Sequence, residues 1–165
     1  PGTYADAYQQ FGRLSSEIWR AIRLVVDTGL HAKGWTEQEA IDYFMANSPE
    51  PYESVRSEVR RYIVMPGQAT SYKIGMIKIL ELRSTAIEAL GDDFDIRGFH
   101  DTVLGAGSLP LDLLADAAAA AAAQAREEEA LKTEKLKEDL AKLVDDGDLA
   151  DGVILAGGQS FPLHR

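Results

Sequence analysis

The chain has 165 residues, of which 45% are hydrophobic and 27% charged, and its formal net charge is -10. This length is enough for one domain with a hydrophobic core, and the acidic balance argues against a nucleic-acid partner, because phosphate binding requires clustered Lys and Arg. The absence of cysteine excludes disulfides and thiolate metal sites, and no apolar run is long enough to form a transmembrane segment.

The N-terminus reads Pro-Gly-Thr-Tyr, without an initiator Met and without a signal-peptide pattern. We therefore expect a chain that has been processed or that begins partway along a longer protein. The sequence predicts no particular compartment, so the localisation stays unknown.

Apolar residues recur at steps of three and four nearly throughout, which predicts an all-α fold. Start and stop signals are clear at several points: Thr36 and Glu39 have the spacing of a capping box, Asp95 is a candidate N-cap, and Gly91 is a natural helix end. The sequence predicts helices over residues 4–30, 36–47, 51–64, 68–90, 95–104 and from 108 onward.

The last predicted helix changes character along its length. An unbroken alanine run, Ala117 to Ala123, is followed by charged residues interleaved with leucines, and alanine has the highest helix propensity. Leu136, Leu140 and Leu143 form one stripe, with Leu131 near its edge, which favours either a short coiled-coil seam or a docking face. We expect the tail after Gly147 to be disordered or extended along a partner, and we find no strand-pairing signal in the sequence.

Arg23, Asp27 and His31 are spaced four apart, so they share one face of a continuous helix. Such a row could fix the tautomer of the histidine and present a charged donor to a reacting carbonyl. The alternative is a buried ion pair between helices, with His31 at the helix C-terminus. Spacing alone favours this structural alternative.

A second candidate group follows the break at Pro66 and Gly67. The hydroxyl of Tyr72 could donate to a developing oxyanion, and the Gln68 amide could hold a substrate backbone, with Lys73 beside them. The alternative is an ordinary helix N-terminus with a half-buried tyrosine and a lysine that extends to solvent. Spacing alone again favours the alternative.

Metal ligands are scarce in this sequence. No HExxH or HxH pair occurs, and His100 has no second histidine near it, so we expect no zinc site built from this chain alone. A GxSxG nucleophile motif and a phosphate-binding glycine loop are also absent.

Three segments, occurring in order, carry a family resemblance: RLVVDTGLHAKGWTEQEAIDYF, RYIVMPGQATSYKIGMIKILELR and GDDFDIRGFHDTVLGAGSLPLDLL. The region from Tyr4 to Leu114 resembles the C-terminal end of a bacterial domain-of-unknown-function family, number eight-eight-five. That family looks similar to the helical HExxH zinc peptidases. The resemblance implies a helical fold with a deep cleft, with zinc ligands upstream of the matched region.

The resemblance also implies roles for the candidate residues. Tyr72 matches the tyrosine of the family segment PGQ-x3-YK and would stabilise a tetrahedral intermediate, with Gln68 and Lys73 binding substrate. Arg23, Asp27 and His31 match its R-x3-D-x3-H segment and would line the cleft. Zinc would come only from a partner chain, so we expect no cofactor in this chain.

The sequence predicts three regions: a peptidase-family-like helical region over residues 1–114, an added helix over 115–147 and a tail over 148–165. A half-fold exposes apolar surface, which predicts protein partners. We expect a non-catalytic helical subunit or scaffold of a larger assembly. The alternative is the C-terminal chain of a split or processed zinc metallopeptidase, and under either hypothesis the isolated chain should be inactive, because it lacks the metal that generates the nucleophile.

Overall fold

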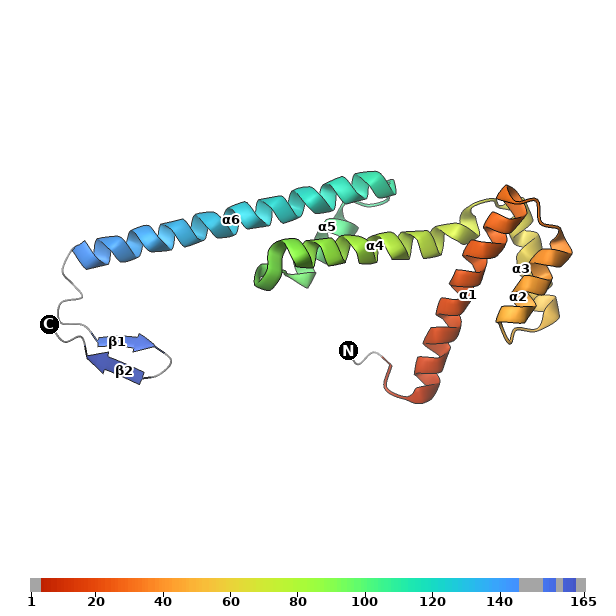
Figure 1. The fold of residues 1–165 in the computed structure, drawn as a ribbon, viewed down its shortest axis with the longest axis horizontal. Coiled ribbons are helices and arrows are strands. Elements are labelled where there is room, and N and C mark those ends of the chain that lie inside the picture. The colour runs from red at the N-terminus through yellow and green to blue at the C-terminus, as the bar shows by residue number, and fades with distance from the viewer. Residues whose placement is uncertain (1–3, 146–152, 157–158, 163–165) are drawn as a thin grey trace. The chain divides into compact units, whose positions relative to one another are not determined.

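The computed structural model describes residues 4–145, 153–156 and 159–162 (Figure 1). Helices dominate this part of the chain, which confirms the all-α expectation. A 3₁₀ turn, Gly91–Asp93, follows the fourth helix. The α-helices are α1 (Ala7–Ala32), α2 (Glu37–Asn47), α3 (Tyr52–Val64), α4 (Gln68–Leu90), α5 (Ile96–Gly105) and α6 (Leu111–Asp145).

The predicted helix boundaries with local signals are confirmed. The Thr36 side chain accepts from the Glu39 backbone N–H while the Glu39 carboxylate accepts from the Thr36 backbone N–H, which completes the capping box of α2. These hydrogen bonds hold the pKa of Glu39 below its usual value. Asp95 caps α5 by accepting from the backbone N–H groups of Arg97 and Gly98.

The chain divides into two compact units, Pro1–Leu82 and Arg83–Arg165, which we call the first and second units. Helix α6 runs without interruption through position 114, where the sequence analysis placed a regional boundary. The three regions expected from the sequence stay a prediction.

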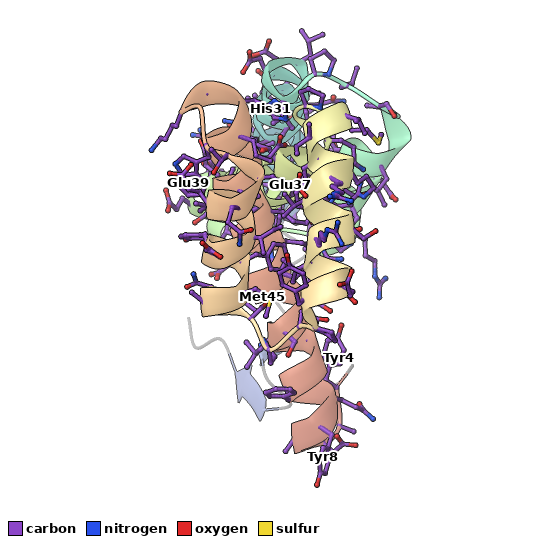
Figure 2. All side chains as sticks on the ribbon, turned by 90° about the vertical axis from the view of Figure 1, so that its right-hand side faces the viewer. Tyr4, Tyr8, His31, Glu37, Glu39 and Met45 are labelled. Carbon is purple, nitrogen blue, oxygen red and sulfur yellow. The ribbon has the colours of Figure 1, made fainter. Side chains whose placement is uncertain are left out.

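The first unit packs α2 and α3 against the C-terminal half of α1 (Figure 2). The ring of Trp19 meets that of Phe44 edge-on, with 4.9 Å between centroids, an arrangement that aromatic pairs favour. Its core consists of fully or almost fully buried side chains: Ile22, Val26, Ala40, Ile41, Phe44, Val55, Val59, Tyr62 and Ala69.

Gly29 allows the chain after α1 to fold back closely. The indole ring of Trp35 lies so near that a Cβ atom at position 29 would come within 2.3 Å of its Cε3 atom. Any larger residue would push the ring away, and Trp35 also packs against Tyr43, with 5.6 Å between ring centroids. Gly29 therefore fixes the turn that brings α2 onto α1.

The N-terminal half of α1 extends beyond α2 and α3, so that Tyr8 lies near its free end (Figure 2). Its apolar side chains are exposed: Tyr8 by 89%, Phe11 by 66%, Leu14 by 53% and Ile18 by 46%. Phe11, Leu14 and Ile18 continue the stripe that farther along α1 enters the core at Ile22. We call these three residues the α1 stripe.

The second unit has a small core of Ala86, Phe99, Leu114 and Ala118. Alanines of α6 contribute little volume, and from residue 130 to residue 143 every side chain of α6 is exposed. Within residues 4–145, none of the helices combines the length and the apolar character that crossing a membrane requires.

The tail contains a short antiparallel pairing of β1 (Val153–Ala156) with β2 (Gln159–Pro162), in which Val153 lies opposite Pro162. The sequence analysis found no strand-pairing signal, so this pairing corrects it. Each strand has only four residues, too few for an alternating pattern to be distinguished. The signal that was missed is the two-glycine separation, a spacing typical of hairpins.

Candidate functional site

The site begins with a helix cap supplied from a distant part of the chain. Gly67 adopts a φ of 79°, a conformation that favours glycine, and so turns the chain into α4. The carboxylate of Asp27, on α1, accepts from the backbone N–H of Gly67 at 3.2 Å, the backbone N–H of Thr70 at 3.0 Å and the Thr70 hydroxyl at 2.8 Å. Asp27 is only 2% exposed, so a buried anion sits at the positive end of α4.

His31 lies one turn beyond Asp27 at the C-terminal end of α1 (Figure 2). Its Nε2 atom is 3.0 Å from the Tyr62 carbonyl oxygen and 3.5 Å from the Asp27 Oδ1 atom. Both neighbours are acceptors, so Nε2 must carry a proton, and in the neutral ring Nδ1 is the acceptor. His31 thus ties the end of α3 to the Asp27 cap.

Arg23 lies on the same face of α1, one turn before Asp27, and is 8% exposed. Its Nη2 atom donates to the Gln68 side-chain oxygen at 3.0 Å. Its guanidinium carbon lies 4.3 Å from the ring centroid of Tyr72 and 5.5 Å from that of Tyr62, which places the cation against two aromatic faces. The Nε atom of Arg23 is buried without a hydrogen-bond partner among the described residues.

Gln68, the first residue of α4, links the arginines to Tyr72. Its side-chain oxygen accepts from Arg23 and also from the Arg61 Nη1 atom, at 2.8 Å. Two cationic donors on the oxygen fix the orientation of the amide, so its NH₂ group faces the Tyr72 hydroxyl oxygen, 3.3 Å away. Tyr72 is 46% exposed, and among the described residues no acceptor takes its own hydroxyl proton.

The sequence analysis missed four residues that complete this network. Thr70 belongs to the Asp27 cap. On α3, the Arg61 guanidinium donates to both oxygens of the Glu58 carboxylate, at 3.2 and 2.7 Å, and the Tyr62 hydroxyl donates to Glu58 at 2.8 Å. The spacing of Glu58 and Arg61, three apart on a predicted helix, was the available signal, whereas nothing local marks Tyr62.

The environment of these side chains is reflected in their pKa values. The hydrogen bonds from Arg61 lower the pKa of Glu58, and the Tyr62 hydroxyl adds to this effect. Burial raises the pKa of Tyr62, and the neighbouring Glu58 carboxylate raises it further. At neutral pH, Glu58 is therefore charged and Tyr62 is protonated.

Lys73 belongs to a different surface. Its Nζ atom lies 3.4 Å from a Glu17 carboxylate oxygen on α1, and it lines an apolar groove of about 620 Å³ with the α1 stripe and Pro49. The structure therefore brings Arg23, Gln68 and Tyr72 together. Asp27 and His31 lie next to each other on α1, and Lys73 is not part of either group. We call Arg23, Gln68 and Tyr72 the donor cluster.

No metal site is formed by the described residues, because no three His, Asp or Glu side chains among them lie close enough together to hold an ion. Asp27, the most buried carboxylate near the cluster, already accepts from the start of α4. The donor set of this region therefore does not fit a zinc ion.

The donor cluster offers a half-exposed hydroxyl with a free proton, held next to a guanidinium charge. Such a group can donate a hydrogen bond to a carbonyl oxygen or an oxyanion. Gln68 fixes the hydroxyl oxygen, and the cap at Asp27 fixes the start of the helix that carries both Gln68 and Tyr72. The arrangement suits ligand recognition or oxyanion stabilisation.

Three comparisons with known proteins bear on the chain. Residues 1–118 match a family described as "Bacterial protein of unknown function (DUF885)". No curated protein matches the chain. Among solved structures, the chain is similar to a protein described as "the putative lipoprotein from Colwellia psychrerythraea", with a TM-score of 0.72 and 44% identity over 74% of this chain.

The chain spans 21% of the length of that solved protein, so the similarity concerns one part of a much longer molecule. The family match covers all of the donor cluster and the Asp27 cap, and it ends within α6. This chain belongs to the DUF885 family of bacterial proteins of unknown function.

Proposed function

We propose that the first unit supplies one wall of a peptidase-type active site, with the donor cluster facing the substrate. The remainder of that site would come from sequence of the DUF885 type outside this chain. The proposal gives Tyr72 the role of oxyanion donor, and it makes Arg23 and Gln68 the residues that hold Tyr72 and contact substrate polar groups.

The observation that carries the proposal is the hydrogen bonding and exposure of the Tyr72 hydroxyl. Its oxygen accepts from Gln68, so its proton points away from Gln68, and the side chain is half exposed. A tyrosine that only stabilises a helix N-terminus needs no such fixation of its oxygen. A donor aimed at the oxygen of a tetrahedral intermediate contributes on the order of 10²-fold to the rate in hydrolases of known mechanism.

We take the reaction class of this proposal from the resemblance to helical zinc peptidases expected from the sequence motifs. Hydrolysis of a peptide bond develops negative charge on the carbonyl oxygen. The Arg23 guanidinium lies against the Tyr72 ring, and a cation at this position would favour that charge. The zinc chemistry would belong entirely to the part of the fold that this chain does not contain.

The test is a chimera in which this chain replaces the matching part of the longer Colwellia relative. We expect the chimera to hydrolyse peptides, and Tyr72→Phe to lower kcat by roughly 10²-fold without lowering the melting temperature. Tyr52→Phe is the matched control, because Tyr52 is 45% exposed, nearly the same as Tyr72. An unchanged rate in Tyr72→Phe would remove Tyr72 from the mechanism, and a folded chimera without peptidase activity would overturn the proposal.

A second candidate function is that of a non-catalytic helical subunit or scaffold, which the sequence alone favours. The observation in its favour is the exposed α1 stripe, which continues the core of the first unit beyond α2 and α3. Exposed apolar stripes of this kind mark protein contacts. Here Ile18→Glu should abolish assembly with the partner, while Tyr72→Phe should change nothing.

A further inference from the structure

Two arginines of α1, Arg20 and Arg23, differ from the other arginines of the first unit. The others each pair with a carboxylate oxygen, at distances from 2.7 to 3.6 Å: Arg13, Arg56, Arg60 and Arg61. Arg20 and Arg23 form no ion pair with the described residues, although the chain has 27 acidic residues against 17 Lys and Arg. They are three apart on one helix, so their like charges repel each other. An anion from outside this chain would stabilise both.

Both arginines line one pocket of about 300 Å³, which we call the arginine pocket. Its other lining residues are mostly polar: Ser15, Ser16, Trp19 and Glu50. Glu50 is the only acid in this lining, and its carboxylate lies beyond ion-pair distance of both guanidinium groups. The lining therefore has two positive charges and one negative charge. A concave surface with an excess of positive charge attracts anions.

The guanidinium groups of this pocket have N–H donors that the described residues do not use. A guanidinium has five such donors. Arg23 is only 8% exposed, yet it donates just to Gln68, and its Nε atom is buried without a partner. A buried charged donor without an acceptor costs free energy. Arg20 donates only to the Ser16 carbonyl oxygen of its own helix, at 2.7 Å. A carboxylate suits this pair, because its two oxygens accept several guanidinium hydrogen bonds at once.

Arg23 belongs both to the arginine pocket and to the donor cluster, so the two lie close together. Its Nη2 atom and the Tyr72 hydroxyl contact the same Gln68 amide, at 3.0 and 3.3 Å. One residue of extended peptide spans roughly 3.3–3.6 Å, so a carboxylate on Arg23 and a carbonyl at the Tyr72 hydroxyl are separated by at most about two residues. A peptide that contacts both groups must therefore end close to the bond that is cleaved.

We propose that Arg20 and Arg23 bind the free C-terminal carboxylate of a peptide substrate. That the carboxylate belongs to a peptide rests on the proposed function, whereas carboxylate binding by the arginine pocket does not. The Tyr72 hydroxyl then donates to the carbonyl oxygen of the bond that precedes the last one or two residues. Hydrolysis adds one water across this bond, which leaves a new carboxyl group on the shortened peptide and an amino group on the released amino acid or dipeptide.

The first test uses the full chain alone and measures binding by nitrogen–proton NMR spectra. N-acetylalanine, which has a free carboxylate, should shift the Trp19 indole signal and the Nε–H signals of Arg20 and Arg23 saturably, with a dissociation constant on the order of 1–10 mM. Trp35 packs on Tyr43, outside the pocket, so its indole signal is the internal control and should stay in place. The neutral N-acetylalaninamide should cause no saturable shift. Equal shifts with both compounds, or none with either, would overturn the inference.

The second test uses the chimera with the Colwellia relative and compares one peptide with its C-terminal amide. We expect kcat/KM to be at least about 10-fold higher for the free carboxylate, because only this form makes charge-assisted hydrogen bonds to the arginines. Equal values for the two peptides would overturn this inference and leave the proposed function intact. A folded chimera that cleaves neither peptide would overturn the proposed function, and the NMR titration then decides on the carboxylate pocket by itself.

Substitution of Arg20 separates carboxylate binding from catalysis. Arg20→Gln should raise KM for the free-carboxylate peptide about 10-fold, with little change in kcat and no change for the amidated peptide. Tyr72→Phe should instead lower kcat for both peptides. Arg56→Gln is the matched control, since it removes the same charge from an exposed pair with Glu53, and it should change neither constant. An Arg20→Gln variant that loses equally on both peptides, or on neither, would overturn the inference.

Discussion

Asp27 and Tyr72 belong to one connected network, but their environments differ. Asp27 is almost completely buried, and its oxygens accept three hydrogen bonds from the start of α4. Tyr72 is half exposed, and its hydroxyl proton has no acceptor among the described residues. A buried group whose hydrogen bonds are all made inside the chain serves stability, whereas an exposed group held in place with a free donor is available to a ligand.

The largest effect on stability is expected from Asp27→Ala. This change leaves the N–H groups of Gly67 and Thr70 and the Thr70 hydroxyl without their acceptor in a buried place. We expect the free energy of unfolding to fall by about 3–5 kcal/mol, measured by urea denaturation. The control is Asp42→Ala, because Asp42 is exposed and accepts only from the Gln38 side chain. Equal losses in the two variants would contradict the capping role of Asp27.

This cap also shows what the sequence could and could not predict. Helix ends that depend on neighbours in the chain, such as Thr36 with Glu39, were predicted because both partners lie within one turn. Asp27 was expected to line a cleft or to join an ion pair, and its partners at Gly67 and Thr70 lie 40 and 43 residues away. A hydrogen bond over that separation depends on how α1 and α4 pack, which periodicity does not encode.

The donor cluster was predicted only in part, because some of its contacts lie within one helix and others depend on the packing of two helices. Gln68 and Tyr72 lie one turn apart on one helix, so their proximity followed from spacing. The contact of Arg23 with both of them follows only from the packing of α1 beside the start of α4. Lys73, adjacent to Tyr72 in sequence, points toward Glu17 instead, because successive residues of a helix face different directions.

An intermediate effect is expected from Glu58, which supports the network from α3. Its pKa is lowered in the folded chain, so the stability that it contributes is complete above pH 4.5 and is lost as the pH falls through the folded-state pKa. Between about pH 5 and pH 3, the unfolding free energy of Glu58→Gln should fall by about 1–2 kcal/mol less than that of the unsubstituted chain. Urea denaturation at each pH gives this slope.

Glu53→Gln serves as the matched control for this pH dependence. Glu53 is on the same helix and pairs with Arg56 at 3.6 Å, but its side chain is 79% exposed. We expect the slope of this variant to match that of the unsubstituted chain, because exposed pairs contribute little. A flatter slope in Glu53→Gln than in Glu58→Gln would contradict the assigned role of Glu58.

The smallest effect on stability is expected from Tyr72→Phe. The substitution keeps the ring against Arg23 and removes one long, partly exposed hydrogen bond, so the unfolding free energy should change by less than about 0.5 kcal/mol. Tyr62→Phe should cost more, about 1 kcal/mol or above, because the Tyr62 hydroxyl donates to Glu58 from a buried ring. A large loss in Tyr72→Phe would indicate a structural role and weaken the contrast with Asp27.

The positions of the two tryptophans have a practical consequence. Trp19 packs on Phe44, Trp35 covers Gly29, and the chain has no other tryptophan. Indole fluorescence therefore reports only on the first unit, whereas far-ultraviolet circular dichroism, which sums all helices, is weighted by the long helix α6. If the two signals change at different denaturant concentrations, the units unfold separately, and fluorescence alone would then give the stability of the first unit and not that of the whole chain.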